Sequence, residues 1–277
     1  MKLPEIQDRL IAHVAMADRS AFEAIYDQAA GLLYAICLRI LQDAQEAEDC
    51  VQSLFTQLWN CPEDLRAASE PLMMQLVTAA RAEAMLRRVG QDRNIEPIAT
   101  RDLSPLQPNA RPSTVEAQDG SLSGVLDQMP PARSTLMRRI ILDGEGYADL
   151  SRASQVDVGT VRTSIAQTLA SLAAKLGAPE FSREDIIAAG EAALGLRDRG
   201  SSAPELSAFW NTQIATMIGA EVQSVAPSSQ LKRRLDAALF AEKRETLWQQ
   251  VWPYAAGGVA AAFLLWVVVA SGLLVPI

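Results

Sequence analysis

Apolar side chains recur at helical spacing through the first part of the chain, and this repeat restricts the fold more than any other feature. Intervals of three and four residues place side chains on one face of an α-helix. The clearest stripe comprises Phe22, Ile25, Tyr26, Leu33, Tyr34, Cys37, Leu38 and Leu41. Aromatic residues make up only 5% of the 277 residues, and Asn-Gly or Asp-Gly turns are few, which disfavours sheet. We therefore predict an all-α protein.

A helical block is predicted over residues 1–93, followed by a linker. After the first stripe, a second helix begins near Asp43 with acidic residues in its first turn, where the helix dipole favours them. A third helix is expected between about residue 71 and residue 88. Residues 94–122 carry four prolines and no apolar stripe, so we predict a flexible linker there.

Two more helical blocks are predicted beyond the linker. Residues 123–177 favour short helices, and the last two are joined by a tight turn, with the second helix the longer. This is the geometry of a helix-turn-helix, although many small bundles share it. Residues 182–250 begin with Ser182 followed by acidic residues, which is typical of a helix start. Helices are expected near 183–196, 203–221 and 228–250.

Charge and residue types narrow the classes of function. With 25 Lys and Arg against 33 Asp and Glu, the net charge of −8 excludes nucleic-acid binding through global positive charge, but leaves a local basic face open. Three widely spaced cysteines, Cys37, Cys50 and Cys61, with His13 as the single histidine, argue against a disulfide framework and a zinc site. No Gly-rich phosphate loop and no Ser/His/Asp grouping is evident. We predict no enzyme, no metal and no cofactor.

The charge-free run at residues 255–275 predicts a membrane span. Its 21 residues would rise about 31 Å as a helix, which matches a hydrocarbon core of about 30 Å. Trp252 and Tyr254 precede the run, at the level where amphipathic rings favour the membrane interface. Basic residues are concentrated before it, at Lys232, Arg233, Arg234, Lys243 and Arg244.

We therefore predict a single-pass transmembrane helix over residues 254–275 in the cytoplasmic membrane. Positive charge on the N-terminal side of the span places the bulk of the chain in the cytoplasm. The alternative is a buried C-terminal core helix.

Runs in the first two blocks resemble a known family. Residues 21–26 (AFEAIY), 33–34 (LY) and 43–59 (DAQEAEDCVQSLFTQLW) resemble the second conserved region of extracytoplasmic-function (ECF) sigma factors. Residues 129–133 (MPPAR), 146–147 (GY) and 156–162 (VDVGTVR) resemble the fourth region of that family, a helix-turn-helix. The resemblance covers about residues 5–177. It implies two small sigma-type helical domains, at 1–93 and 123–177.

The resemblance implies two partners, core RNA polymerase and promoter DNA. In the family, the second region binds the clamp helices of the polymerase and opens the −10 element, and the fourth region reads the −35 element. The implied polymerase-binding residues are Glu48, Asp49, Gln52, Phe55 and Trp59. For Phe55 and Trp59 the alternative is core packing. The candidate DNA-binding residues are Arg81, Arg87, Arg88, Arg139, Thr160, Arg162 and Thr163.

The sequence departs from the family pattern at both helices that would read DNA. The −10-reading helix of the family usually carries a Trp, an Arg-Asn pair and an Asp, where this chain has Met73, Ala79-Ala80 and Ala84. The expected recognition helix has few charges apart from Arg162 and Lys175. Each lost phosphate contact weakens binding and lowers its salt dependence.

The third block resembles a different class of regulator. Residues 186–196, 209–210 and 227–235 are similar to membrane-bound, zinc-free anti-sigma factors. Such domains wedge between the two sigma regions and hide their polymerase-binding faces. The resemblance implies an anti-sigma-like domain at 182–250 that contacts the sigma regions of the same chain.

These observations lead to a main hypothesis and two alternatives. The main hypothesis is a membrane-tethered ECF-type sigma factor, autoinhibited by its fused anti-sigma-like domain and released by proteolysis, a membrane partner or a competing protein. The first alternative is a sigma-like adaptor that does not bind DNA and instead engages polymerase or regulatory proteins at the membrane. The second is a generic membrane-tethered helical binding protein.

Overall fold

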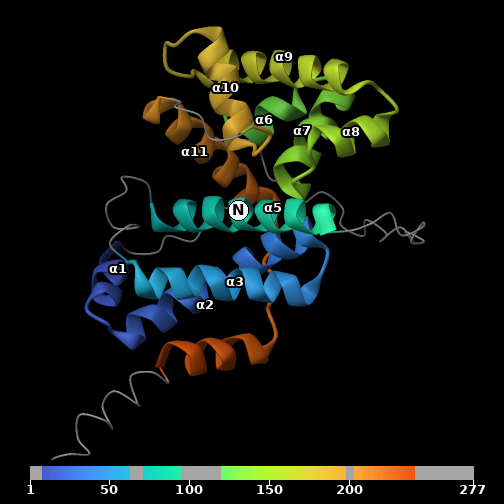
Figure 1. The fold of residues 1–277 in the computed structure, drawn as a ribbon. Coiled ribbons are helices and arrows are strands. Elements are labelled where there is room, and N and C mark those ends of the chain that lie inside the picture. The colour runs from blue at the N-terminus through green and yellow to red at the C-terminus, as the bar shows by residue number, and fades with distance from the viewer. Residues whose placement is uncertain (1–7, 63–70, 95–119, 198–202, 241–277) are drawn as a thin grey trace, which may run out of the picture. The chain divides into compact units, whose positions relative to one another are not determined.

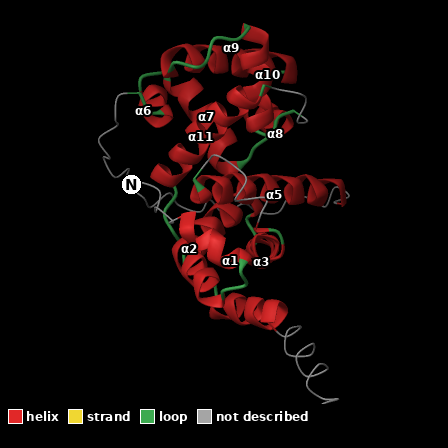
Figure 2. Cartoon of the chain, turned by 90° about the vertical axis from the view of Figure 1, so that its left-hand side faces the viewer, coloured by secondary structure: helices red, strands yellow, loops and turns green. Residues whose placement is uncertain are grey.

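The computed structural model describes residues 8–62, 71–94, 120–197 and 203–240. Within these ranges all regular secondary structure is helical, which confirms the all-α prediction for the part of the chain described (Figure 2). Residues 1–227 form one compact unit, and a second unit begins at residue 228. In the second unit, residues 229–240 are helical.

Among the described residues before 95, three helices pack against a central helix, α2 (Arg19–Leu41). They are α1 (Asp8–Ala15), α3 (Ala44–Asn60) and α5 (Leu72–Asn94). Asp18 and Asp43 cap α2 and α3 by accepting hydrogen bonds from backbone N–H groups of the first turn. The predicted start near Asp43 is therefore confirmed.

An aromatic cluster joins α2 to α3. Phe22 contacts Phe55 and Trp59 edge-on, with ring centroids 5.9 and 5.5 Å apart, and Tyr26 lies 4.9 Å from Phe55. Phe55 is 1% exposed, so it belongs to the core. Aromatic pairs of this geometry stabilise a core beyond the area that they bury.

Four further helices contain the predicted helix pair. They are α6 (Leu122–Asp127), α7 (Pro131–Asp143), α8 (Tyr147–Ser154) and α9 (Val158–Leu176). Between α8 and α9 the chain turns at Gln155, whose φ of +55° lies in the left-handed region, and Asp157 caps α9. The expected short helix, tight turn and longer helix are present.

Helices α10 (Arg183–Ala193) and α11 (Pro204–Glu221) complete the first unit. The Ser182 side chain caps α10, as its sequence predicts. The buried Trp210 of α11 donates a hydrogen bond from its indole N–H to the Ile186 carbonyl at 3.1 Å. Helix α11 packs against α5 as well as against α6 and α7, so it contacts both groups of helices (Figure 1).

The predicted transmembrane helix over 254–275 lies outside the described residues, as does the end of the predicted helix 228–250. Among the residues that are described, α2 is the one helix long and apolar enough to cross a membrane. Of its most apolar stretch, 67% is buried inside the protein, which is typical of a core helix.

Candidate polymerase and nucleic-acid interface

The outward face of α3 carries two of the five residues expected to bind polymerase. Asp49 and Gln52 lie along a shallow groove, whereas Glu48 is 9% exposed and Phe55 is a core residue. Trp59 is half-buried against Phe22. The groove is lined by Asp49, Gln52, Ser53, Thr56, Gln57, Asn60 and Cys61. Phe55 is therefore a core residue, which is the alternative that the sequence leaves open for it and for Trp59.

Arg81, in the middle of α5, is buried rather than displayed to solvent. Its exposed fraction is 4%, and its guanidinium donates four hydrogen bonds of 3.0–3.1 Å to backbone carbonyls. Two acceptors, Ile140 and Ile141, lie in the last turn of α7, and two, Ala193 and Leu194, lie at the end of α10. Burial lowers the pKa of Arg81 to about 10, so the side chain is cationic at neutral pH. In this arrangement Arg81 is not accessible to a DNA phosphate.

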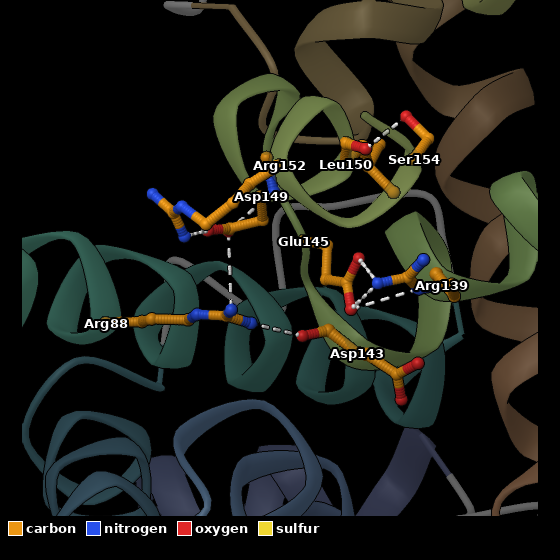
Figure 3. Close-up of polar contacts among 9 residues, drawn as sticks. Arg88, Arg139, Asp143, Glu145, Asp149, Leu150, Arg152 and Ser154 are labelled. Atoms are coloured by element: carbon orange, nitrogen blue, oxygen red, sulfur yellow. Dashed lines mark hydrogen bonds and ion pairs between the residues drawn. The ribbon is translucent and has the colours of Figure 1, made fainter. Parts of the chain in front are cut away.

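Arg88, two turns further along α5, also reaches the end of α7. It donates to the Asp143 carbonyl at 2.7 Å and contacts the Asp149 carboxylate at 3.3 Å (Figure 3). From α2, Arg39 donates to the Asp143 carboxylate at 2.6 Å. Carbonyls at a helix C-terminus lack intrahelical partners and carry partial negative charge, so cations are stabilising there.

The turn after α7 sits directly on α2 and α5. Gly144 ends α7 with a φ of +64°, a conformation that L side chains rarely adopt. A Cβ at Gly144 would lie 3.0 Å from the Ile40 Cγ2 atom and 3.3 Å from the Met85 Cγ atom. The close approach of this turn therefore depends on glycine.

Two other arginines expected to bind DNA make ion pairs. Arg87 pairs with Glu83, one turn earlier on α5, at 2.8 Å, and lies 3.9 Å from the Glu46 carboxylate on α3. Arg139 pairs with Glu145 at 2.7 Å and donates to it from both Nε and Nη2 (Figure 3). Both pairs are partly exposed, and partly exposed pairs of this kind stabilise by little.

The residues of α9 that are expected to bind DNA lie near the exposed start of the helix. Thr160, Arg162 and Thr163 are all exposed, and the Arg162 guanidinium stacks 5.0 Å from the centroid of the Tyr147 ring. The Tyr147 hydroxyl donates to the Glu191 carboxylate on α10 at 2.6 Å. Burial and the negative charge of Glu191 raise the pKa of Tyr147. Glu191 of α10 thus accepts a hydrogen bond from the tyrosine whose ring stacks against Arg162.

The end of α11 and the segment after it contact both groups of helices. Glu221 pairs with Arg138 of α7 at 3.1 Å. The backbone N–H of Val225 donates to the Gly31 carbonyl in α2 at 3.1 Å. A Cβ at Gly31 would meet the Ser224 hydroxyl, which would have to rotate away, whereas the backbone oxygen of Val225 would lie at an ordinary contact distance of 3.5 Å.

Sequence reasoning missed several of these residues. Arg39 and Gly31 were not singled out, although Gly31 in the middle of an apolar helical stripe is a signal, because glycine there destabilises a helix. Tyr147 and Glu191 lie in runs that resemble the two families, but neither was given a role. Nothing local marks Arg39.

Comparisons with known proteins show which family the chain resembles. The family model described as Sigma-70 region 2 matches residues 25–88, which contain α3 and most of α2 and α5. The chain is accordingly similar to the ECF RNA polymerase sigma factors over region 2, and that family is not a family of enzymes.

Individual relatives extend the similarity beyond region 2. The ECF RNA polymerase sigma factor SigL of Mycobacterium tuberculosis is 27% identical over 158 residues, which are 56% of this chain and 88% of that protein. The ECF RNA polymerase sigma factor SigK of Mycolicibacterium vanbaalenii is 23% identical over 178 residues, 61% of this chain and 89% of the relative.

Proposed function

We propose that this chain is an ECF sigma factor that initiates transcription with core RNA polymerase and promoter DNA, and that its own C-terminal helices hold it closed. The observation that supports the closed state is the burial of Arg81. A cation on the helix expected to contact the −10 element is buried against α7 and α10, and all four of its hydrogen bonds cross to those helices.

The position of α11 supports the wedge that the anti-sigma resemblance implies. Helix α11 packs against α5 on the region 2 side and against α6 and α7 on the other. The contacts of Glu221 with Arg138 and of Val225 with Gly31 anchor the two ends of the same short segment to the two groups of helices. Closure would be favoured without tight intrinsic affinity, because tethered modules meet at a high effective concentration.

The test is transcription by core RNA polymerase on DNA upstream of the gene, with fragment 1–177 compared with fragment 1–250. Circular dichroism verifies that both fragments are helical. Activity in the short fragment and its loss in the long one is the expected result. Equal activity of the two fragments refutes internal inhibition, and silence of both refutes initiation.

A membrane tether at 254–275 is the second part of the proposal. Its support is the charge-free run of 21 residues, preceded by aromatic and basic residues. We expect the full chain to remain in the membrane fraction after alkaline carbonate extraction, and a chain ending at residue 250 to be released. Extraction of the full chain by carbonate alone would refute the tether.

A sigma-like adaptor that does not bind DNA is the second candidate. The observation that favours it is the exposed side of α9, where Arg162 and Lys175 are the cations. An adaptor would retain core polymerase in a pull-down with fragment 1–177, but would show no salt-sensitive promoter binding. Promoter binding that weakens steeply with salt would exclude this candidate.

A further inference from the structure

Three arginines of the region 2 helices converge on one end of α7. We call Arg39, Arg81 and Arg88 the arginine collar. Arg81 binds the carbonyls of Ile140 and Ile141, Arg88 binds the carbonyl of Asp143, and Arg39 binds the Asp143 carboxylate. Figure 3 shows the Arg88 arm of the collar reaching from α5 to Asp143 and Asp149.

The collar binds a cluster of oxygen acceptors, most of them backbone carbonyls with partial negative charge and two of them carboxylates. The last carbonyls of α7 carry the negative end of the helix dipole, and two carboxylates, those of Asp143 and Asp149, add full charges. The guanidinium fork binds such oxygens, and it binds phosphate oxygens with the same geometry. The end of α7 therefore presents to region 2 the chemistry that a nucleic-acid backbone would present.

Two members of the collar, Arg81 and Arg88, are also residues expected to contact DNA. Their donors are occupied, at 2.7–3.3 Å, by oxygens of α7, α8 and α10. One set of donors cannot serve two sets of acceptors at once. The closed contact and nucleic-acid binding at this face exclude each other for that reason.

We propose that the arginine collar is a nucleic-acid phosphate-binding surface, and that the C-terminal end of α7 is its internal competitor. Nucleic acid bound to the collar displaces α7, and α7 seated in the collar excludes nucleic acid. This inference rests on the proposed sigma function, and it adds that the helix-turn-helix half itself, not only α10 and α11, masks region 2.

A competitor of this kind reduces apparent affinity in proportion to the open fraction of the chain. A substitution that weakens the competitor without touching the collar must then tighten nucleic-acid binding. Asp143→Lys is such a substitution: it repels Arg39, leaves all three arginines in place, and puts a lysine at a helix C-terminus, where it is tolerated. Glu180→Lys, in the exposed loop between α9 and α10, changes the net charge equally and serves as the matched control.

The experiment uses the full chain in detergent and a fluorescent single-stranded oligonucleotide of about 20 nucleotides. Coupled sites typically change each other's affinity by about 5–150-fold. We expect Asp143→Lys to bind the oligonucleotide at least about fivefold more tightly than Glu180→Lys does. Its salt slope should steepen by about 0.7 for each arginine freed. Asp143→Asn should change affinity in the same direction by less.

A distance measurement tests the exclusion directly. Spin labels are placed on the exposed natural Cys61 and on a cysteine replacing the exposed Gln167 of α9, while Cys37 and Cys50 are buried. The expected result is a longer and broader distance distribution after the oligonucleotide is added, and for Asp143→Lys without it. Oligonucleotide binding that leaves the distances unchanged, or equal affinities of Asp143→Lys and its control, would overturn the inference.

The outcome is separable from that of the proposed function. Core polymerase pull-down by the same variants reports on the sigma role alone. Polymerase binding together with unchanged oligonucleotide affinity would reject the competitor and leave the sigma function standing. Tighter oligonucleotide binding without polymerase binding would reject the sigma function and leave the competition standing.

Discussion

Replacement of Arg81 by methionine tests the closed arrangement most directly. The substitution keeps an unbranched stem and removes every donor of the guanidinium. The lost hydrogen bonds all end on α7 and on the end of α10, so the energy is lost from closure rather than from packing within region 2.

The magnitude follows from the acceptors left behind. A buried carbonyl that loses its partner costs about 1–3 kcal/mol. The four acceptors form two adjacent pairs, one at each helix end, and we count one penalty for each pair because adjacent carbonyls can share a water molecule. The sum is about 2–6 kcal/mol, and its middle, about 4 kcal/mol, is roughly a 700-fold change in the equilibrium between closed and open chain.

The assay is amide hydrogen exchange at the ends of α7 and α10, with thermal unfolding in parallel. We expect exchange there to accelerate by about the same factor, since opening exposes these amides. Arg87→Met is the control on the same helix. Its pair with Glu83 is partly exposed and lies within α5, so its loss should cost only about 0.3–0.5 kcal/mol. Equal protection in the two variants would refute the assignment of Arg81 to closure.

Three further predictions concern α2 and the cysteines. Gly31→Ala should raise the melting temperature of an isolated region 2 by improving helix propensity, and should raise that of the full chain by less, because the Ser224 hydroxyl must rotate away from the added Cβ. The added change Ser224→Gly should remove this difference, and a larger gain in the full chain than in the isolated region would contradict the contact. Only the thiol of Cys61 should react with a thiol reagent in the native state, and all three thiols should react after denaturation. The reason is that Cys37 and Cys50 are buried, and that the contact with the Cys50 thiol, together with burial, raises the pKa of Cys37. Fast labelling of all three thiols in the native state would contradict this prediction. Hydrogen bonds from Ser20 lower the pKa of Asp18 from its usual value, so the stability that this cap contributes is present above the unfolded pKa and lost as pH falls through the folded pKa. Asp18→Asn should flatten that acid limb of the melting-temperature profile, while Asp18→Ala lowers the melting temperature at neutral pH. Identical profiles of Asp18→Asn and the wild type would count against this role of the cap.

Local features of the fold could be predicted from the sequence because their causes lie within a few residues along the chain. The apolar stripe of α2, the cap at Asp43 and the cap at Ser182 each depend on neighbours three or four positions away. The turn before α9 could likewise be predicted from residues 155–158. The polymerase-binding residues came instead from the family resemblance, and of these Asp49 and Gln52 lie along the groove on α3 while Glu48 and Phe55 are buried.

The sequence by itself therefore determined an all-α chain with a sigma-type region 2 and a helix-turn-helix pair, while the tertiary structure decided what the arginines do. Arg81 lies 59 or more residues from each of its four acceptors, and Arg39 lies 104 residues from Asp143. No periodicity links positions so far apart. An arginine that binds phosphate and one buried against two helix ends look alike in sequence, and only the packing of α5 on α7 and α10 distinguishes them.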